Sequence, residues 1–170
     1  LSGAQRVRPL AQLVFLGARE DASSRQLREW SDSLRAAERI RLVPVTPDVG
    51  AWYGLSDLLV CASDIESLPR VVLEAMAWEL PVLATDVFGL GELIEDGESG
   101  WLCADRDVEA LATALDAVLD MEPGRRIAIG RQGRQRVESR HDMDGYCEDF
   151  VRLLDRAIED RDVAEPGRAD

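Results

Sequence analysis

Two glutamates, Glu66 and Glu74, are the residues of this chain whose types and spacing point most directly to chemistry. Seven residues separate them, and a strand-like apolar run, residues 58–61, precedes the first. Glu74 lies in an otherwise apolar helical stretch, residues 71–78, where burying an unpaired carboxylate is costly. Glu74 is therefore expected either at the rim of the core, paired with an arginine, or against a ligand whose hydroxyl groups it binds.

The residues between the two glutamates predict a helix over residues 67–79 with an anion site at its start. Ser67 is a candidate N-cap, and proline is tolerated in the first turn, so Glu66 lies in the preceding loop. The rise per residue then separates the carboxylates by roughly 10–12 Å along the axis. The first-turn N–H groups favour an anion between them. A nucleoside diphosphate sugar fits this layout; a loop acid and an unrelated rim acid explain the spacing equally well.

Composition restricts the possible classes of protein. The 170 residues are 46% hydrophobic, which suits one folded domain over residues 1–160 followed by a flexible tail over 161–170. The net charge of −13, with every base an arginine, opposes binding to nucleic acid. No apolar run approaches the length of a membrane span. Cys61, Cys103 and Cys147 have no metal-ligand spacing and favour a reducing, cytoplasmic location.

Apolar runs at residues 13–16, 40–43, 58–61, 82–84 and 101–103 alternate with helical patterns. This alternation predicts an α/β fold: a doubly wound, Rossmann-like parallel sheet of about five strands, with helices on both faces and further helices at the C-terminal end. Ligands of such sheets bind at the carboxyl ends of the strands. Glu66 and residues 45–48 and 86–91 all follow strands, so we expect them at this edge. The arginine-rich residues 125–140 are read as a solvated helix face in preference to a phosphate site.

The stretch Ser63-Asp-Ile-Glu-Ser-Leu-Pro-Arg-Val-Val-Leu-Glu-Ala-Met-Ala77, with its continuation through residues 79–102, resembles the donor signature of the group 1 (family 4) retaining glycosyltransferases of GT-B architecture. The resemblance covers about residues 13–155. Three positions where relatives commonly have glycine carry other residues here, namely Ser67, Glu79 and Phe88, and Gly91 stands where proline is expected. Phe88 in particular narrows the space expected for the donor sugar.

The resemblance implies a role for each matching residue. Glu66 is the candidate catalytic residue beside the transferred sugar, and Glu74 binds the ribose hydroxyls of the donor. The donor diphosphate is expected at the loop and helix start formed by Ser67, Leu68, Arg70 and Val71, where the Arg70 side chain either contributes or makes a surface ion pair. Val45 and Thr46 border the nucleobase, and Gly89 either approaches the sugar or forms a plain turn. The donor is a UDP- or GDP-sugar, and no metal or other cofactor is implied.

The resemblance also implies parts that this sequence lacks: a first strand, an Arg–Lys pair that binds the diphosphate, and an N-terminal GT-B domain in the same or a partner chain. We therefore expect a fragment or split half of a hexosyltransferase that is inactive alone, with membrane association only through the missing domain. One alternative is a degenerate domain that serves as a scaffold or partner-binding half. A dinucleotide enzyme is disfavoured because no Gly-x-Gly-x-x-Gly follows the first apolar run.

Overall fold

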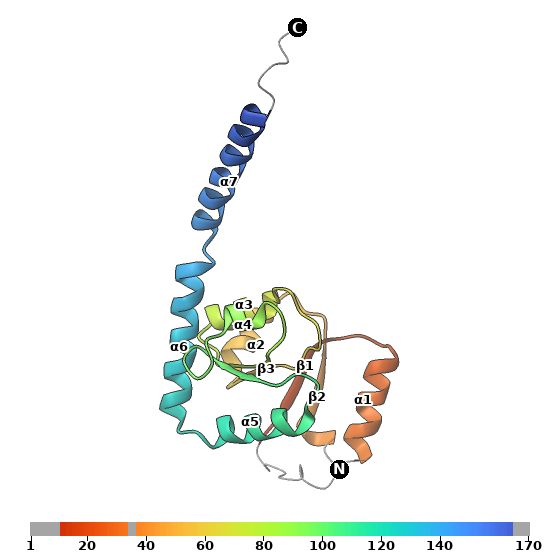
Figure 1. Cartoon of the computed structure of the whole chain (residues 1–170). Coiled ribbons are helices and arrows are strands. Elements are labelled where there is room, and N and C mark those ends of the chain that lie inside the picture. Colours follow the sequence, from red (N-terminus) through yellow and green to blue (C-terminus); the bar gives the residue numbers. More distant parts are fainter. Residues whose placement is uncertain (1–10, 34–36, 165–170) are drawn as a thin grey trace. The chain divides into compact units, whose positions relative to one another are not determined.

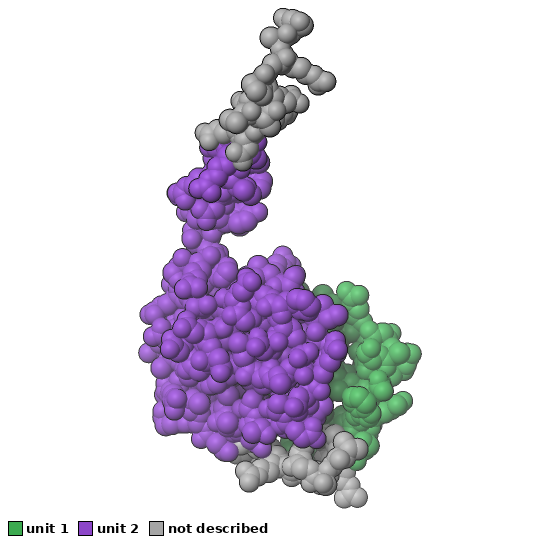
Figure 2. Space-filling view, in the orientation of Figure 1, with its two compact units in different colours: residues 1–55 green, residues 56–170 purple. Residues whose placement is uncertain are grey.

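The computed structural model describes residues 11–33 and 37–164. The chain divides into two compact units, residues Leu1–Leu55 and Ser56–Asp170 (Figure 2). The predicted strand at residues 13–16 and the nucleobase candidates lie in the first unit, whereas the Glu66–Glu74 stretch lies in the second.

The first unit is a small parallel β/α arrangement. Its two strands pair in parallel, with Leu13 opposite Ile40 and Phe15 opposite Leu42. Between the two strands lie a helix and, after a gap in the described residues, a 3-10 turn. The elements are β1 (Leu13–Ala18), α1 (Ala22–Ser33), the turn η1 (Ala37–Arg39), β2 (Ile40–Pro44) and α2 (Val49–Leu55) (Figure 1).

The second unit holds a three-stranded parallel sheet in the order β3-β4-β5. The central strand β4 is buried at all four positions, as expected for a strand covered on both faces. The elements are β3 (Leu59–Cys61), α3 (Arg70–Ala77), β4 (Val82–Thr85), α4 (Leu90–Leu93), β5 (Trp101–Cys103), α5 (Val108–Asp120), α6 (Pro123–Arg140) and α7 (Met143–Ala164) (Figure 1).

The predicted α/β class and all five parallel strands are confirmed, but the strands form a two-stranded and a three-stranded sheet. Burial also differs between them. Strand β1 alternates exposed and half-buried positions, whereas β4 is buried along its whole length. The proposed tail boundary at residue 161 falls inside α7, and residues 165–170 lie outside the described part of the chain.

The core of the second unit lies between β4 and the helices α3, α4, α5 and α6. Helix α6 packs against α3, and the approach is close at Gly130, where a side chain would collide with the Glu79 carbonyl oxygen. The largest fully buried side chains are Met76, Leu83, Leu90, Leu93, Ile94, Val72, Val82 and Val118. These residues fix α3 and α4, the two helices that follow the strand ends where the site was predicted.

Helix α3 begins three residues later than predicted. Its N-cap is Pro69, which has an extended backbone (φ −71°, ψ 113°), and no side chain caps it. The prediction of Ser67 as N-cap is therefore wrong. The physical reason is Pro69, whose ring disfavours a helical backbone at the preceding Leu68, so the helix cannot start at Ser67. The axial estimate of roughly 10–12 Å assumed helical rise through residues 67–69 and does not apply to them.

Candidate functional site

Glu66 lies in the loop that follows β3, and its carboxylate is held from within that loop. The Ser63 hydroxyl donates a hydrogen bond of 3.3 Å to Glu66 Oε1. The Glu66 residue is half-buried, so part of its surface remains accessible to a ligand. The loop thus presents one half-buried, hydrogen-bonded carboxylate beyond the carboxyl end of the parallel strand β3, the strand-end position that was predicted.

Thr85 ties the end of β4 to the same loop. Its hydroxyl donates to the Ser63 carbonyl oxygen at 2.6 Å, and the residue is 4% exposed. A second, longer contact of 3.5 Å reaches the Cys61 carbonyl oxygen. Thr85 is a site residue that the sequence analysis missed, because nothing local links it to Ser63, 22 residues earlier. The carboxyl ends of β3 and β4 are consequently joined by a buried side chain.

Gly89 brings the loop after β4 against the loop after β3. A side chain at this position would collide with the carbonyl oxygen of Ser67, so only glycine permits the approach. Gly89 also precedes α4 as its N-cap residue. The sequence left open a plain turn or a close approach to a sugar; the close approach seen in the structure is to the Ser67 backbone. A role of Gly89 toward a ligand stays a prediction.

The start of α3 lies directly beyond this contact. The Pro69 carbonyl oxygen accepts hydrogen bonds from the amides of Val72 (3.0 Å) and Leu73 (3.4 Å). The amides of Arg70 and Val71 precede these, at the end of the helix where N–H groups lack intrahelical acceptors. Leu68 lies in the loop before the helix, so its amide is not one of the N–H groups of the first helical turn.

Glu74 lies on the exposed face of α3 rather than in the core. The buried residues of this helix are Val72, Ala75 and Met76, whereas Arg70, Val71 and Glu74 are exposed. The rim position expected as one alternative is therefore the one observed, and a ligand is not needed to offset burial of the carboxylate. Arg70 makes no ion pair with any described residue, so the surface ion pair suggested for it is absent from that part of the chain.

Val45 and Thr46 lie in the first unit, in the loop between β2 and α2. Val45 is 70% exposed, and the Thr46 hydroxyl oxygen accepts a hydrogen bond of 3.2 Å from the Asp48 amide. These two residues follow a strand end, as predicted. Their part in a nucleobase site stays a prediction, since they belong to a different unit from Glu66 and Glu74.

Two of the positions where glycine was expected have left-handed backbones. Glu79 has φ 58° and Phe88 has φ 42°, a region that glycine adopts without strain and other residues rarely occupy. Glu79 lies two residues beyond the last residue of α3, and Phe88 precedes Gly89 in the loop after β4. The side chain of Phe88 is 74% exposed, so it does not plug the space beside the Ser67 loop.

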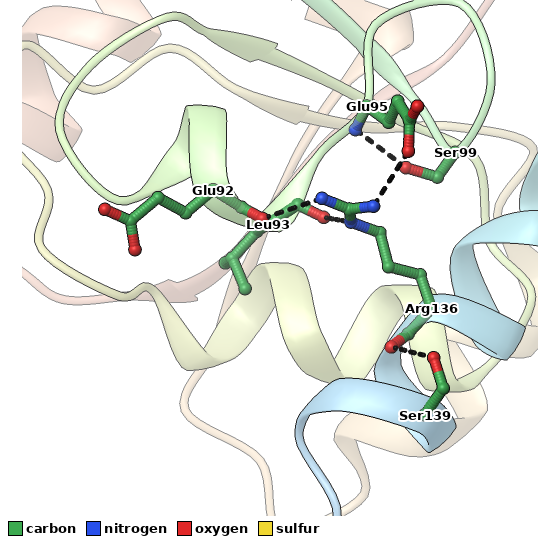
Figure 3. Close-up of polar contacts among 6 residues, drawn as sticks. All are labelled: Glu92, Leu93, Glu95, Ser99, Arg136 and Ser139. Carbon is green, nitrogen blue, oxygen red and sulfur yellow. Dashed lines mark hydrogen bonds and ion pairs between the residues drawn. The ribbon is translucent and has the colours of Figure 1, made fainter.

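Arg136 of α6 holds the far end of α4 (Figure 3). Its guanidinium donates to the backbone carbonyl oxygens of Leu93 (2.7 Å) and Glu92 (3.0 Å) and pairs with the Glu95 carboxylate at 2.9 Å. The Arg136 side chain is 14% exposed, so the solvated face predicted for residues 125–140 does not include it. The sequence offered no signal for this contact, because Arg136 lies 43 positions after Leu93 in the chain.

Among residues 11–33 and 37–164, no group of three or more His, Cys, Asp and Glu residues is arranged to hold a metal ion. None of the helices in this part of the chain is both long enough and apolar enough to cross a membrane.

Comparison with known proteins identifies the family. Residues 4–136 match the family described as glycosyl transferases group 1. A D-inositol 3-phosphate glycosyltransferase of Rhodococcus jostii is 37% identical over 138 residues, which cover 78% of this chain and 29% of that protein. This chain therefore spans less than a third of the length of that relative.

Solved structures share the fold. HepE of Anabaena, determined in complex with UDP, matches with a TM-score of 0.80 and 21% identity over 87% of this chain and 42% of its own. The C-terminal domain of a group 1 glycosyl transferase family protein of Francisella tularensis matches with a TM-score of 0.72 and 24% identity. That match covers 82% of this chain and 74% of the solved domain. By sequence match and by fold, this chain belongs to the group 1 glycosyl transferases.

Proposed function

We propose that this chain is the donor-binding domain of a retaining glycosyltransferase, which transfers a hexose from a UDP- or GDP-sugar to an acceptor. One observation carries the proposal: the loops after β3 and β4 are joined to each other by Thr85 and Gly89. This junction holds the backbone of the loop that carries Glu66 and leads into α3, which supports a ligand site there. A site at the carboxyl ends of neighbouring parallel strands is where ligands of such folds bind.

Each residue has a proposed role in this site. Glu66 accepts hydrogen bonds from the hydroxyls of the transferred sugar, and Glu74, exposed one turn into α3, accepts them from the ribose. The diphosphate lies against the amides of Leu68, Arg70 and Val71, where the positive end of the helix dipole favours an anion. Ser67 and Gly89 shape the loop contact, and Val45 and Thr46 border the nucleobase. Departure of the leaving group then depends on stabilising the diphosphate, with no metal or other cofactor proposed.

The rest of the catalytic machinery is proposed to lie outside this chain. The chain matches 29% of the length of the Rhodococcus relative, and its sequence has no Lys to complete the Arg–Lys pair expected on the diphosphate. An N-terminal GT-B domain, in the same or a partner chain, would supply the acceptor site and any membrane association of this cytoplasmic assembly. We expect weak donor binding and no turnover by the isolated chain; sugar transfer catalysed by it would contradict this.

Titration of the chain with UDP-glucose and GDP-mannose, followed by ligand-observed NMR, tests the proposal. We expect saturable binding of one donor, weakened at least tenfold in Glu74→Ala, because the variant loses charge-assisted hydrogen bonds to the ribose. Glu109→Ala, which removes an exposed acid from the first turn of α5, is the matched control and is expected to bind normally. No binding of either donor at millimolar concentration would instead favour the degenerate scaffold.

A further inference from the structure

The strained backbone of Phe88 destabilises the protein, and no contact within the described part of the fold offsets this cost. Its backbone has φ 42°, where the Cβ atom of a non-glycine residue is strained. Its side chain is 74% exposed, so the ring gains little from burial. Neither the backbone geometry nor the packing of this loop therefore explains a phenylalanine at this position.

The surrounding structure fixes the conformation of this residue. The neighbouring Val87 and Leu90 are 6% and 0% exposed, and the Leu90 amide donates to the Val87 carbonyl oxygen at 3.0 Å. Gly89 packs closely against the Ser67 carbonyl oxygen. Arg136 holds the other end of α4 (Figure 3). A strained residue that is so firmly held is characteristic of a binding site.

The neighbours of Phe88 in the chain indicate what its ring would bind. It is adjacent in the chain to Gly89, which touches Ser67, and Ser67 follows Glu66. A pyranose presents hydroxyl groups at its edge and C–H groups on its faces; a carboxylate suits the first, and an aromatic ring suits the second. We propose that Phe88 is a specificity-determining residue whose ring packs against the C–H face of the donor's sugar. This proposal rests on the proposed function.

Paired titrations of this chain isolate the contact with the sugar. Binding of UDP is compared with binding of UDP-glucose, and binding of GDP with binding of GDP-mannose, in the wild type, Phe88→Ala, Phe88→Gly and Phe88→Tyr. For the pair that binds, we expect Phe88→Ala and Phe88→Gly to weaken the nucleotide sugar about fivefold through lost apolar contact. Binding of the bare nucleotide should be unchanged, and Phe88→Tyr should retain the wild-type ratio.

Two controls make the outcome decisive. Trp78→Ala removes an exposed aromatic residue at the C-terminal end of α3, away from the proposed site. It is expected to leave the affinities for the nucleotide and for the nucleotide sugar unchanged. Phe88→Gly relieves the backbone strain, so its melting temperature should not fall below that of the wild type. An unchanged ratio in Phe88→Ala, which is expected if the ring instead faces a partner domain, would overturn this inference alone. Absence of all nucleotide binding by the wild type would overturn the proposed function, and this inference with it.

Discussion

Glu79 occupies the one position at the end of α3 that demands a left-handed backbone. The Leu80 amide donates to the Ala75 carbonyl oxygen (3.0 Å) and the Glu79 amide to that of Met76 (2.9 Å). This pair of bonds is the Schellman pattern, in which glycine is the preferred residue. The Glu79 carboxylate lies 3.6 Å from Arg131 and 3.9 Å from Arg134, but exposed pairs of this length stabilise little.

We expect Glu79→Gly to stabilise the protein. Relief of the positive φ outweighs the loss of the exposed ion pairs and should raise the free energy of unfolding by about 0.5–1 kcal/mol. Chemical denaturation of the two proteins measures the difference. Glu79→Ala is the matched control, since it removes the same ion pairs but keeps the Cβ atom, and no gain is expected from it. Equal destabilisation of both variants would mean that the ion pairs, not the backbone, dominate at this position.

At the scale of elements, α6 acts as a support for both helices of the candidate site. Gly130 lets it approach the end of α3, and Arg136 binds the end of α4. Helix α4 has only four residues, so its own hydrogen bonds cannot hold it in place. Beside the buried Leu90 and Leu93 side chains, a guanidinium from α6 therefore helps to hold the helix that follows the loop of Phe88 and Gly89.

Replacing this guanidinium tests the support. Arg136→Met leaves the Glu92 and Leu93 carbonyl oxygens without their donor, and we expect a loss of about 2–3 kcal/mol in unfolding free energy. Arg131→Met, on the same helix with its side chain 66% exposed, is the control and should change stability little. The measurement is equilibrium denaturation of both variants; similar stabilities would show that Arg136 does not hold α4.

The elements that the sequence predicted are those set by local pattern. All five strands were found because each is a continuous apolar run. The loops predicted to hold the site do follow strand ends, and their binding of a ligand stays a prediction. The start of α3 was predicted wrongly because the effect of Pro69 on Leu68 was overlooked. Thr85 and Arg136 could not be found, since their partners lie 22 and 43 residues away and no local pattern encodes those contacts.

At the scale of the whole molecule, α7 is a helix without a core of its own. Among residues 143–158, every residue except Gly145 is exposed, including a stacked pair, Tyr146 and Phe150, with ring centroids 6.2 Å apart. The other exposed apolar residues of this helix are Met143, Val151, Leu153, Leu154 and Ile158. Such a face contributes to stability only when something covers it.

Deleting residues 142–170 should therefore leave the rest of the chain as stable as before, with a melting temperature changed by less than about 2 °C. Deleting residues 122–170 also removes α6, whose Ile129 is 6% exposed, and should unfold the second unit. A large loss from the shorter deletion would mean that α7 already packs on this chain. If α7 instead covers a domain outside it, the same deletion in a longer protein carrying that domain should lower the melting temperature, because the apolar face is then buried.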